Sequence, residues 1–132
     1  MNILCVDGDL FHLVKLRRDV RRIVPNAHIV CCRNPDKAIK RAKEKRCDIL
    51  ITATDFAGFR RDGFSLAEEI MAFNAKTDVI LISEQESYVE AYKAYQVFAS
   101  DFIVRPYEKS RLAKAFTKLR YASLSRPDLH AA

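Results

Sequence analysis

Short apolar runs alternate along the chain with longer stretches in which apolar residues recur every three or four positions. The short runs have the length and polar boundaries of buried strands and cover residues 2–6, 28–32, 48–53, 79–83 and 101–104. The longer stretches have the spacing of amphipathic helices and cover residues 10–24, 34–45, 64–73, 86–97 and 108–121. The pattern predicts five strand–helix units in one domain over residues 1–121, followed by a short tail over 122–132.

The expected strands are apolar on both faces, as in DILITA at 48–53 and VILIS at 79–83. Strands of this kind separated by helices form a parallel sheet that is covered on both sides. Because crossovers between parallel strands are right-handed, the helices divide between the two faces. We therefore predict an α/β fold, a (βα)₅ doubly wound sandwich around a five-stranded parallel sheet. Such sheets bind ligands at the carboxyl ends of their strands, which is where chemistry is expected.

The composition fits a single globular domain. The chain has 132 residues, of which 49% are hydrophobic and 30% charged, and this excludes general disorder. No apolar run approaches the ~18 residues that span a membrane, and the first run ends at Asp7, too early for a signal peptide. We expect a cytoplasmic protein with no membrane attachment. Cys5, Cys31, Cys32 and Cys47 form no C-x-x-C pair and are expected to be reduced residues near the core.

The formal net charge of +6 admits a nucleic-acid or nucleotide binder as one class of function. Residues 33–46 hold seven basic side chains against two acidic ones, and the first predicted helix holds five more basic side chains. The two helices are expected on opposite or adjoining faces of the sheet, depending on strand order. Few aromatic residues stand among these charges and no glycine-rich phosphate loop follows the first strand. A solvated basic face is therefore the preferred interpretation.

Four of the predicted strand ends carry candidate functional residues, namely Asp7-Gly8-Asp9, Ala53-Thr54-Asp55, Ser83 and Arg105-Pro106. This array resembles the receiver domain of bacterial two-component response regulators, and the resemblance extends from Asn2 to Leu119. It rests on the order and spacing of ILCVDGD, AIKRAKEKRCDILIT, DGFSLAEEI, VILIS and ASDFIVRPYEKSRL. The resemblance implies a flavodoxin-like (CheY-like) fold and a signalling module that is not an enzyme.

The resemblance also assigns roles to individual positions. In that family two acids after the first strand and an aspartate after the third bind Mg²⁺, and that aspartate is phosphorylated. A hydroxyl, an aromatic side chain and a lysine from the fourth and fifth strands respond to the phosphoryl group. Asp7 matches the first acid, but Gly8 stands at the second. Ser83 matches the hydroxyl and Phe102 the aromatic, whereas Arg105 replaces the lysine with a bulkier, planar cation.

The position of the phosphoacceptor depends on the direction of counting. Counted forward from Asp48 it falls on Ala53, and counted back from Asp62-Gly63 it falls on Asp55. The two counts differ by two residues, so an insertion lies either in the third strand or in the loop after it. Loops tolerate insertions far better than buried strands, and we therefore favour Ala53 at the aligned position. Asp55 is then the remaining candidate phosphoacceptor.

The sequence predicts a degraded phosphorylation site. Asp7, Asp9 and Asp55 are left to form an acidic pocket, although Asp9 is also expected to cap the helix that follows it. Mg²⁺ is expected to bind weakly or not at all, through Asp7 and Asp55, and no other cofactor is expected. Such a site resembles the pseudo-receiver branch of the family, which signals by protein contact. The alternative is a working phosphoacceptor at Asp55 that uses Mg²⁺.

The resemblance implies that the fourth helix, fifth strand and fifth helix form the contact face, which here carries Tyr88, Tyr92, Tyr95 and Tyr107. Tyrosine is favoured at interfaces because it joins apolar area to a polar tip. The expected partner is a signalling protein, either a histidine kinase or a downstream effector, or a second copy of the chain bound through the same face. Nucleic acid is not expected, and the eleven residues after the last helix are too few for a DNA-binding domain.

Overall fold

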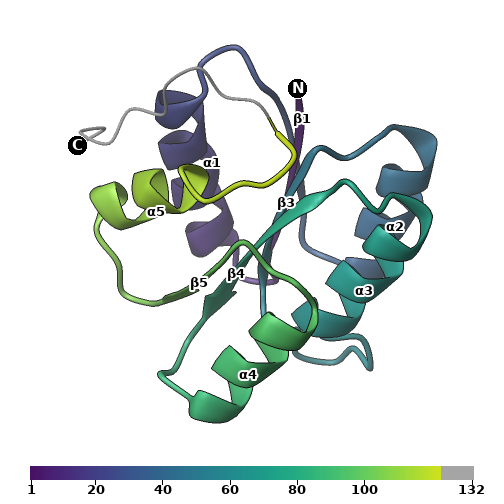
Figure 1. Cartoon of the computed structure of the whole chain (residues 1–132), viewed down its shortest axis with the longest axis vertical. Helices are drawn as coiled ribbons and strands as arrows, with labels where there is room; N and C mark the ends of the chain where they lie inside the picture. Colours follow the sequence, from purple (N-terminus) through teal and green to yellow (C-terminus); the bar gives the residue numbers. More distant parts are fainter. Residues whose placement is uncertain (123–132) are drawn as a thin grey trace.

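The computed structural model describes residues 1–122 and contains five parallel strands between two layers of helices (Figure 1). The strands are β1 (Asn2–Val6), β2 (His28–Cys32), β3 (Ile49–Ala53), β4 (Asp78–Ser83) and β5 (Asp101–Val104). The helices are α1 (Leu10–Ile23), α2 (Pro35–Glu44), α3 (Gly63–Phe73), α4 (Tyr88–Gln96) and α5 (Lys109–Phe116). The strand order is β2-β1-β3-β4-β5, so the predicted doubly wound α/β sandwich is confirmed.

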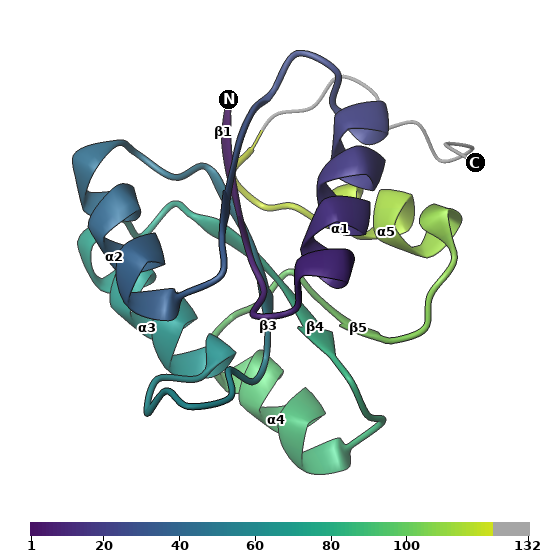
Figure 2. The ribbon, with the colours of Figure 1, turned by 180° about the vertical axis from the view of Figure 1, so that it is seen from behind.

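The core consists of two clusters, one on each face of the sheet. Side chains alternate along β3, so Ile51 packs with α1 and α5 while Leu50 packs with α2, α3 and α4. Figure 2 shows α2 and α3 on one side of the sheet and α1 and α5 on the other. The two basic helices α1 and α2 therefore lie on opposite faces, which the sequence had left open. Their charges do not join into one continuous basic helical face.

The fifth helix is shorter than the sequence predicted. It ends at Phe116, although apolar spacing had extended it to residue 121. The buried carboxylate of Asp78 accepts the backbone N–H groups of Arg120, Tyr121 and Ala122 at 2.7, 3.0 and 2.7 Å. A helix would direct these amides to its own carbonyls, so their capture by the carboxylate ends the helical path. Beyond Ala122, the predicted tail lies outside the described residues.

The fourth helix also begins later than predicted, at Tyr88 rather than residue 86. Ser87 caps it, because its side-chain oxygen accepts the backbone N–H of Glu90 at 3.3 Å. Among residues 1–122, no helix combines the length and the apolar character needed to cross a membrane.

Parallel pairing brings the carboxyl ends of β1, β3, β4 and β5 to one edge of the sheet, here called the carboxyl edge. The register of β3 is continuous along both neighbours, from Ile49 opposite Ile3 on β1 to Ala53 opposite Ile82 on β4. The chain leaves β5 with the backbone N–H of Arg105 donating to the carbonyl of Ser83 at 2.8 Å. This edge therefore gathers the polar residues that the sequence had placed at strand ends.

Candidate functional site

Asp7 lies at the centre of the carboxyl edge, directly after β1. Its side chain is only 5% exposed. One carboxylate oxygen, Oδ1, accepts the backbone N–H of Asp9 at 2.8 Å, which fixes the carboxylate over the turn that leads into α1. Because a buried carboxylate is unstable without a compensating partner, its second oxygen requires a cation or another donor.

Arg105 supplies that cation. Its guanidinium forms an ion pair with Asp7 Oδ2 and a second one with Glu84 Oε1 at 2.7 Å. The arginine side chain is only 9% exposed, whereas Glu84 lies at the surface. A planar guanidinium can serve two carboxylates at once, which a compact ammonium does less well. Arg105 thus joins the ends of β1, β4 and β5 through its side chain.

His12 borders this ion-pair cluster from the first turn of α1. Its Nδ1 lies 3.5 Å from Glu84 Oε1 and 4.0 Å from Asp7 Oδ2. Neither His12 nor Glu84 was predicted as a site residue. The sequence did hold a signal for Glu84, which directly follows Ser83 at a strand end, and for His12, which stands one turn after Asp9. The imidazole and the glutamate place further ionisable groups beside Asp7 and Arg105.

Asp9 caps α1, the structural role expected for it. Its Oδ1 accepts the backbone N–H of His12 at 3.1 Å, and this hydrogen bond is the main reason that the pKa of the exposed carboxyl is lowered from its ordinary value. An acid at the start of a helix is also stabilised by the positive end of the helix dipole. Asp9 is therefore committed to the helix, although it lies at the same surface depression as Asp7.

The two phosphoacceptor candidates differ in environment. Ala53 is the last residue of β3 and is buried, and its methyl group packs in the core cluster beneath α2 and α3. Asp55 stands two residues further, in the loop, with an exposed side chain. It lines the surface depression that also contains Asp7 and Glu84. The carboxylate that the chain itself supplies after β3, that of Asp55, is therefore at the rim of the site and not on the strand.

The loop after β3 closes tightly over that strand end. The backbone N–H of Gly63 donates to the carbonyl of Thr54 at 2.9 Å. A β-carbon at position 63 would lie 2.0 Å from the carbonyl oxygen of Ala53, so only glycine fits there. The loop is thus anchored at both ends, and Phe56 is buried in the core, while Asp55 and residues 57–60 are exposed.

As arranged, these residues do not fit a magnesium ion. Mg²⁺ requires several oxygen ligands in near-octahedral geometry. Both oxygens of Asp7 are engaged, one by a backbone amide and one by Arg105, and Gly8 offers no carboxylate. Within residues 1–122 no group of three His, Cys, Asp or Glu side chains is placed to hold a metal. The guanidinium supplies the positive charge that would otherwise have to come from an ion.

Ser83 is buried at the end of β4, but its hydroxyl faces the start of α4. Its Oγ lies 3.0 Å from Glu90 Oε1, 2.9 Å from the carbonyl of Gln85, and accepts the backbone N–H of Gln85 at 3.2 Å. These contacts link the carboxyl edge to the first turn of α4. Phe102, on β5, is half-buried against the core cluster that includes α3 and α4. Glu90 was not predicted as part of the site.

Three of the four predicted interface tyrosines are exposed on α4. Tyr88, Tyr92 and Tyr95 are 96%, 62% and 78% exposed. Tyr107 differs, because it is half-buried against the cluster of α1 and α5, with Lys15 Nζ 5.2 Å from its ring centroid. Burial is the main cause that raises the pKa of Tyr107 to about 12. Of these four tyrosines, the three exposed ones therefore all lie on α4, and Tyr107 contributes mainly to packing.

Comparisons with known proteins agree with this fold and identify its family. Residues 3–117 match the family model described as the response regulator receiver domain. The sensory transduction protein LytT of Bacillus subtilis (strain 168) is 21% identical over 120 residues, which cover 91% of this chain and 48% of LytT. The chain thus spans about half the length of that relative.

A second relative is the chemotaxis protein CheY of Thermotoga maritima, which is 28% identical over 86 residues, or 65% of this chain and 70% of CheY. Among solved structures, the response regulatory domain of protein mrkE from Klebsiella pneumoniae superposes with a TM-score of 0.79 at 22% identity. That alignment covers 90% of this chain and 94% of the other. At this identity the structural likeness speaks for the fold alone.

Proposed function

Because the chain belongs to the response regulator receiver domain family, we propose that it is a two-component signalling module that acts through protein contact without an aspartyl phosphate. The observation that carries this proposal is the ion pair between Asp7 and Arg105. In a phosphorylated receiver, a divalent cation relieves the repulsion among crowded carboxylates. Here a permanent side-chain cation already neutralises the one buried acid of the site.

The acceptor position supports the same proposal. The continuous register of β3 with both neighbours favours an insertion in the loop over one in the strand. Ala53 then stands where the family has its phosphorylated aspartate, and a methyl group cannot accept a phosphoryl group. Weak or absent Mg²⁺ binding follows as part of the proposal, because the oxygens of Asp7 are already engaged.

The contact surface that we propose is the exposed face of α4, extended by β5 and α5. Tyr88, Tyr92 and Tyr95 give this face large apolar area with polar tips, a composition typical of binding hot spots. The link from Ser83 to Glu90 connects it to the carboxyl edge. The partner class is a signalling protein, a histidine kinase or an effector, or a second copy of the chain.

One observation favours an alternative function, a working phosphoacceptor at Asp55. This carboxylate is solvent-accessible and lines the same depression as Asp7 and Asp9. A rearranged loop that released Asp7 from Arg105 would allow the acids to share a Mg²⁺ ion. This alternative requires breaking a buried ion pair, which is costly without a replacement partner.

Treatment with acetyl phosphate, followed by intact-mass measurement, separates the two functions. We expect no added phosphate in the 132-residue chain with or without Mg²⁺, and no structural change with beryllofluoride. The matched control is Asp55→Asn, which should behave like the unchanged chain. A gain of one phosphate that Asp55→Asn abolishes would establish the alternative and overturn the proposal.

A further inference from the structure

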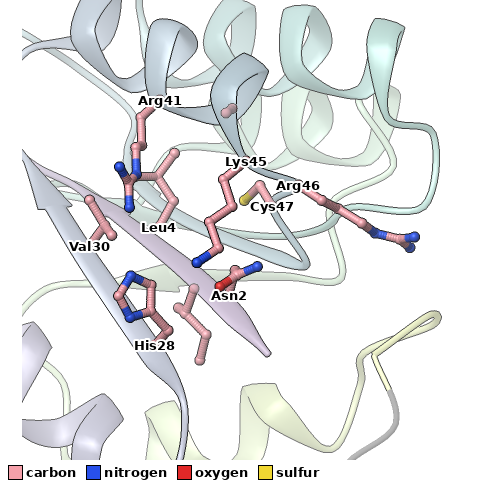
Figure 3. A pocket seen from close by; sticks show the side chains of 10 residues that line it. Asn2, Leu4, His28, Val30, Arg41, Lys45, Arg46 and Cys47 are labelled. Atoms are coloured by element: carbon pink, nitrogen blue, oxygen red, sulfur yellow. The ribbon is translucent and has the colours of Figure 1, made fainter.

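The opposite edge of the sheet, here called the amino edge, carries a second feature that the signalling function does not use. A small pocket opens between the end of α2 and the first residues of β1 and β2 (Figure 3). Its floor is apolar and includes Leu4, Val30 and Cys47. Four basic side chains stand around it, namely those of His28, Arg41, Lys45 and Arg46.

Three of these basic side chains converge from different elements. Arg41 and Lys45 reach down from the end of α2, and His28 rises from the first position of β2, so that all three face the same opening (Figure 3). Among the described residues, none of the three forms an ion pair with an acid. Arg41 and Lys45 are two cations that converge without a counter-ion and repel each other, so the arrangement is stabilised when an anion enters.

Asp48, three residues after Lys45, does not neutralise them. Asp48 accepts the backbone N–H of Asn2 at 2.7 Å and pairs with Arg46 Nε at 3.4 Å. Figure 3 shows Arg46 directed away from the other three basic side chains. Asp48 and Arg46 therefore form a separate pair, and Arg41, Lys45 and His28 retain their donors for a ligand.

The helix dipole accounts for only part of this cluster. Basic residues are favoured in the last turn of a helix, which explains Arg41, Lys43 and Lys45 equally well. Lys43, however, has its ammonium 5.8 Å from the ring centroid of Phe73 and does not line the pocket. His28 belongs to a strand and gains nothing from the dipole. The convergence on one opening thus needs a second reason.

We propose that this amino-edge pocket binds a compact oxyanion, best matched by the phosphate group of a small molecule. A guanidinium fork, an ammonium and an imidazole together offer donors to several oxygens of one phosphate. The cavity encloses about 20 Å³, room for one water molecule. The phosphate group therefore binds at the opening of the pocket, and the rest of the small molecule is not buried there. A nucleic-acid backbone would instead require a stripe of cations along its path. The site goes beyond the proposed signalling function and is independent of it.

An NMR titration with inorganic phosphate tests the proposal, with sodium chloride added to keep ionic strength constant. Saturable shifts are expected at the backbone amides of Asn2, His28 and Cys47. The double variant Arg41→Gln/Lys45→Gln should weaken phosphate binding about tenfold, since it removes hydrogen bonds to a charged group. The matched control is Lys40→Gln/Lys43→Gln, which removes the same charge from exposed positions of α2 and should bind normally.

Equal weakening in both double variants, or shifts that never saturate, would overturn the proposal, because either result means general attraction to a basic surface. A duplex DNA titration forms the second arm. If the chain binds DNA more tightly than phosphate, and both double variants weaken DNA binding equally, the proposed phosphate site is also contradicted. Thermal melting of each variant confirms folding first, and His28→Gln, on a different element, provides an independent single variant that should weaken phosphate binding.

Discussion

Asp7 and Asp78 are buried carboxylates at opposite edges of the same sheet, and they are neutralised in different ways. At the carboxyl edge, Asp7 meets the side chain of Arg105. At the amino edge, Asp78 accepts three backbone amides from residues 120–122 and a hydrogen bond from Ser100 Oγ at 3.4 Å. Burial is nearly the same, with residue exposures of 4% and 1%. The two carboxylates therefore differ in the groups that neutralise them and not in their burial.

That difference separates a carboxylate whose partner is a movable side chain from one whose partners are mainly backbone amides. A side chain such as Arg105 can rotate away from Asp7 without disturbing the backbone. The amides that hold Asp78 belong to the chain itself and can be withdrawn only if the segment after α5 unfolds. We therefore expect the Asp7–Arg105 ion pair to rearrange more easily than the contacts between Asp78 and the backbone. The predictions below test this contrast, beginning with the largest effect.

Replacing Asp78 by alanine should cost about 3 kcal/mol of the free energy of unfolding, because several buried or half-buried donors lose their acceptor at once. Urea denaturation of Asp78→Ala and the unchanged chain measures the loss. Asp78→Asn keeps one acceptor oxygen and should lose less. A cost below about 1 kcal/mol for alanine, the ordinary size of a single hydrogen bond, would contradict the structural role.

Replacing Arg105 by methionine should cost about 2 kcal/mol, since Asp7 remains buried without its cation. The loss is smaller than at Asp78 because Asp7 keeps the hydrogen bond from the backbone N–H of Asp9. The second ion pair of Arg105, with the exposed Glu84, adds little. Arg33→Met is the matched control. Its guanidinium is exposed and donates to the carbonyl of Gly8 at 3.1 and 3.2 Å, so its removal should change stability little. Equal losses of unfolding free energy for the two variants in urea denaturation would contradict the role of Arg105 in stabilising the buried Asp7.

The strands and the sheet could be predicted because their signal is local. Each apolar run, such as that of β4, is enough to predict one strand. The helices between the runs indicate that the strands are parallel. Asp9 as the cap of α1 was likewise predictable from its place before the helix. The end of α5 was not, because the group that ends it, Asp78, lies more than forty residues earlier in the chain.

The candidate site shows the same limit. The sequence placed Asp7 and Arg105 at strand ends, but they are separated by 98 positions and nothing local indicates that they pair. Tyr107 was grouped with the tyrosines of α4, because a half-buried tyrosine and an exposed one look alike in sequence. Its contact with Lys15 on α1 depends on how α1 and α5 pack together. Long-range pairing of side chains therefore decides the chemistry that local patterns leave open.

The contrast also predicts which variants affect partner binding. Tyr95→Ala should reduce affinity for the partner by about 2 kcal/mol if this tyrosine anchors the contact face. The reason is that the exposed ring, which would be buried against the partner, is lost. Tyr92→Ala should act similarly, while Asp7→Ala should change affinity little once folding is verified. Sedimentation measures self-association, and a pull-down measures binding to a signalling partner. If Asp7→Ala abolishes binding while the tyrosine variants bind normally, the acidic pocket and not α4 controls the contact.

The smallest expected effect concerns Asp101, an amino-edge carboxylate whose partners include side chains. Its carboxylate pairs with Arg111 at 2.6 Å and with Lys118 at 3.3 Å. Burial alone would raise the pKa of Asp101, but hydrogen bonds from Arg111 and from its neighbouring backbone amide, together with these charges, lower it overall. A lowered pKa means that the folded state favours the charged form. The resulting stability is present above the unfolded pKa of about 4 and is lost as the pH falls through the folded value.

Asp101→Asn should therefore be about 1 kcal/mol less stable than the unchanged chain at pH 7, a modest value because Lys118 and Arg111 are partly exposed. The difference in unfolding free energy between the two proteins should become smaller below about pH 4, where Asp101 of the unchanged chain begins to lose its charge. Denaturation of both proteins at several pH values measures it, with added salt as a second variable. Because this carboxylate is held partly by side chains, salt should weaken its contribution more than that of Asp78. A gap that stays constant down to pH 2 would mean that hydrogen-bond geometry, and not the charge of the carboxylate, stabilises the start of β5.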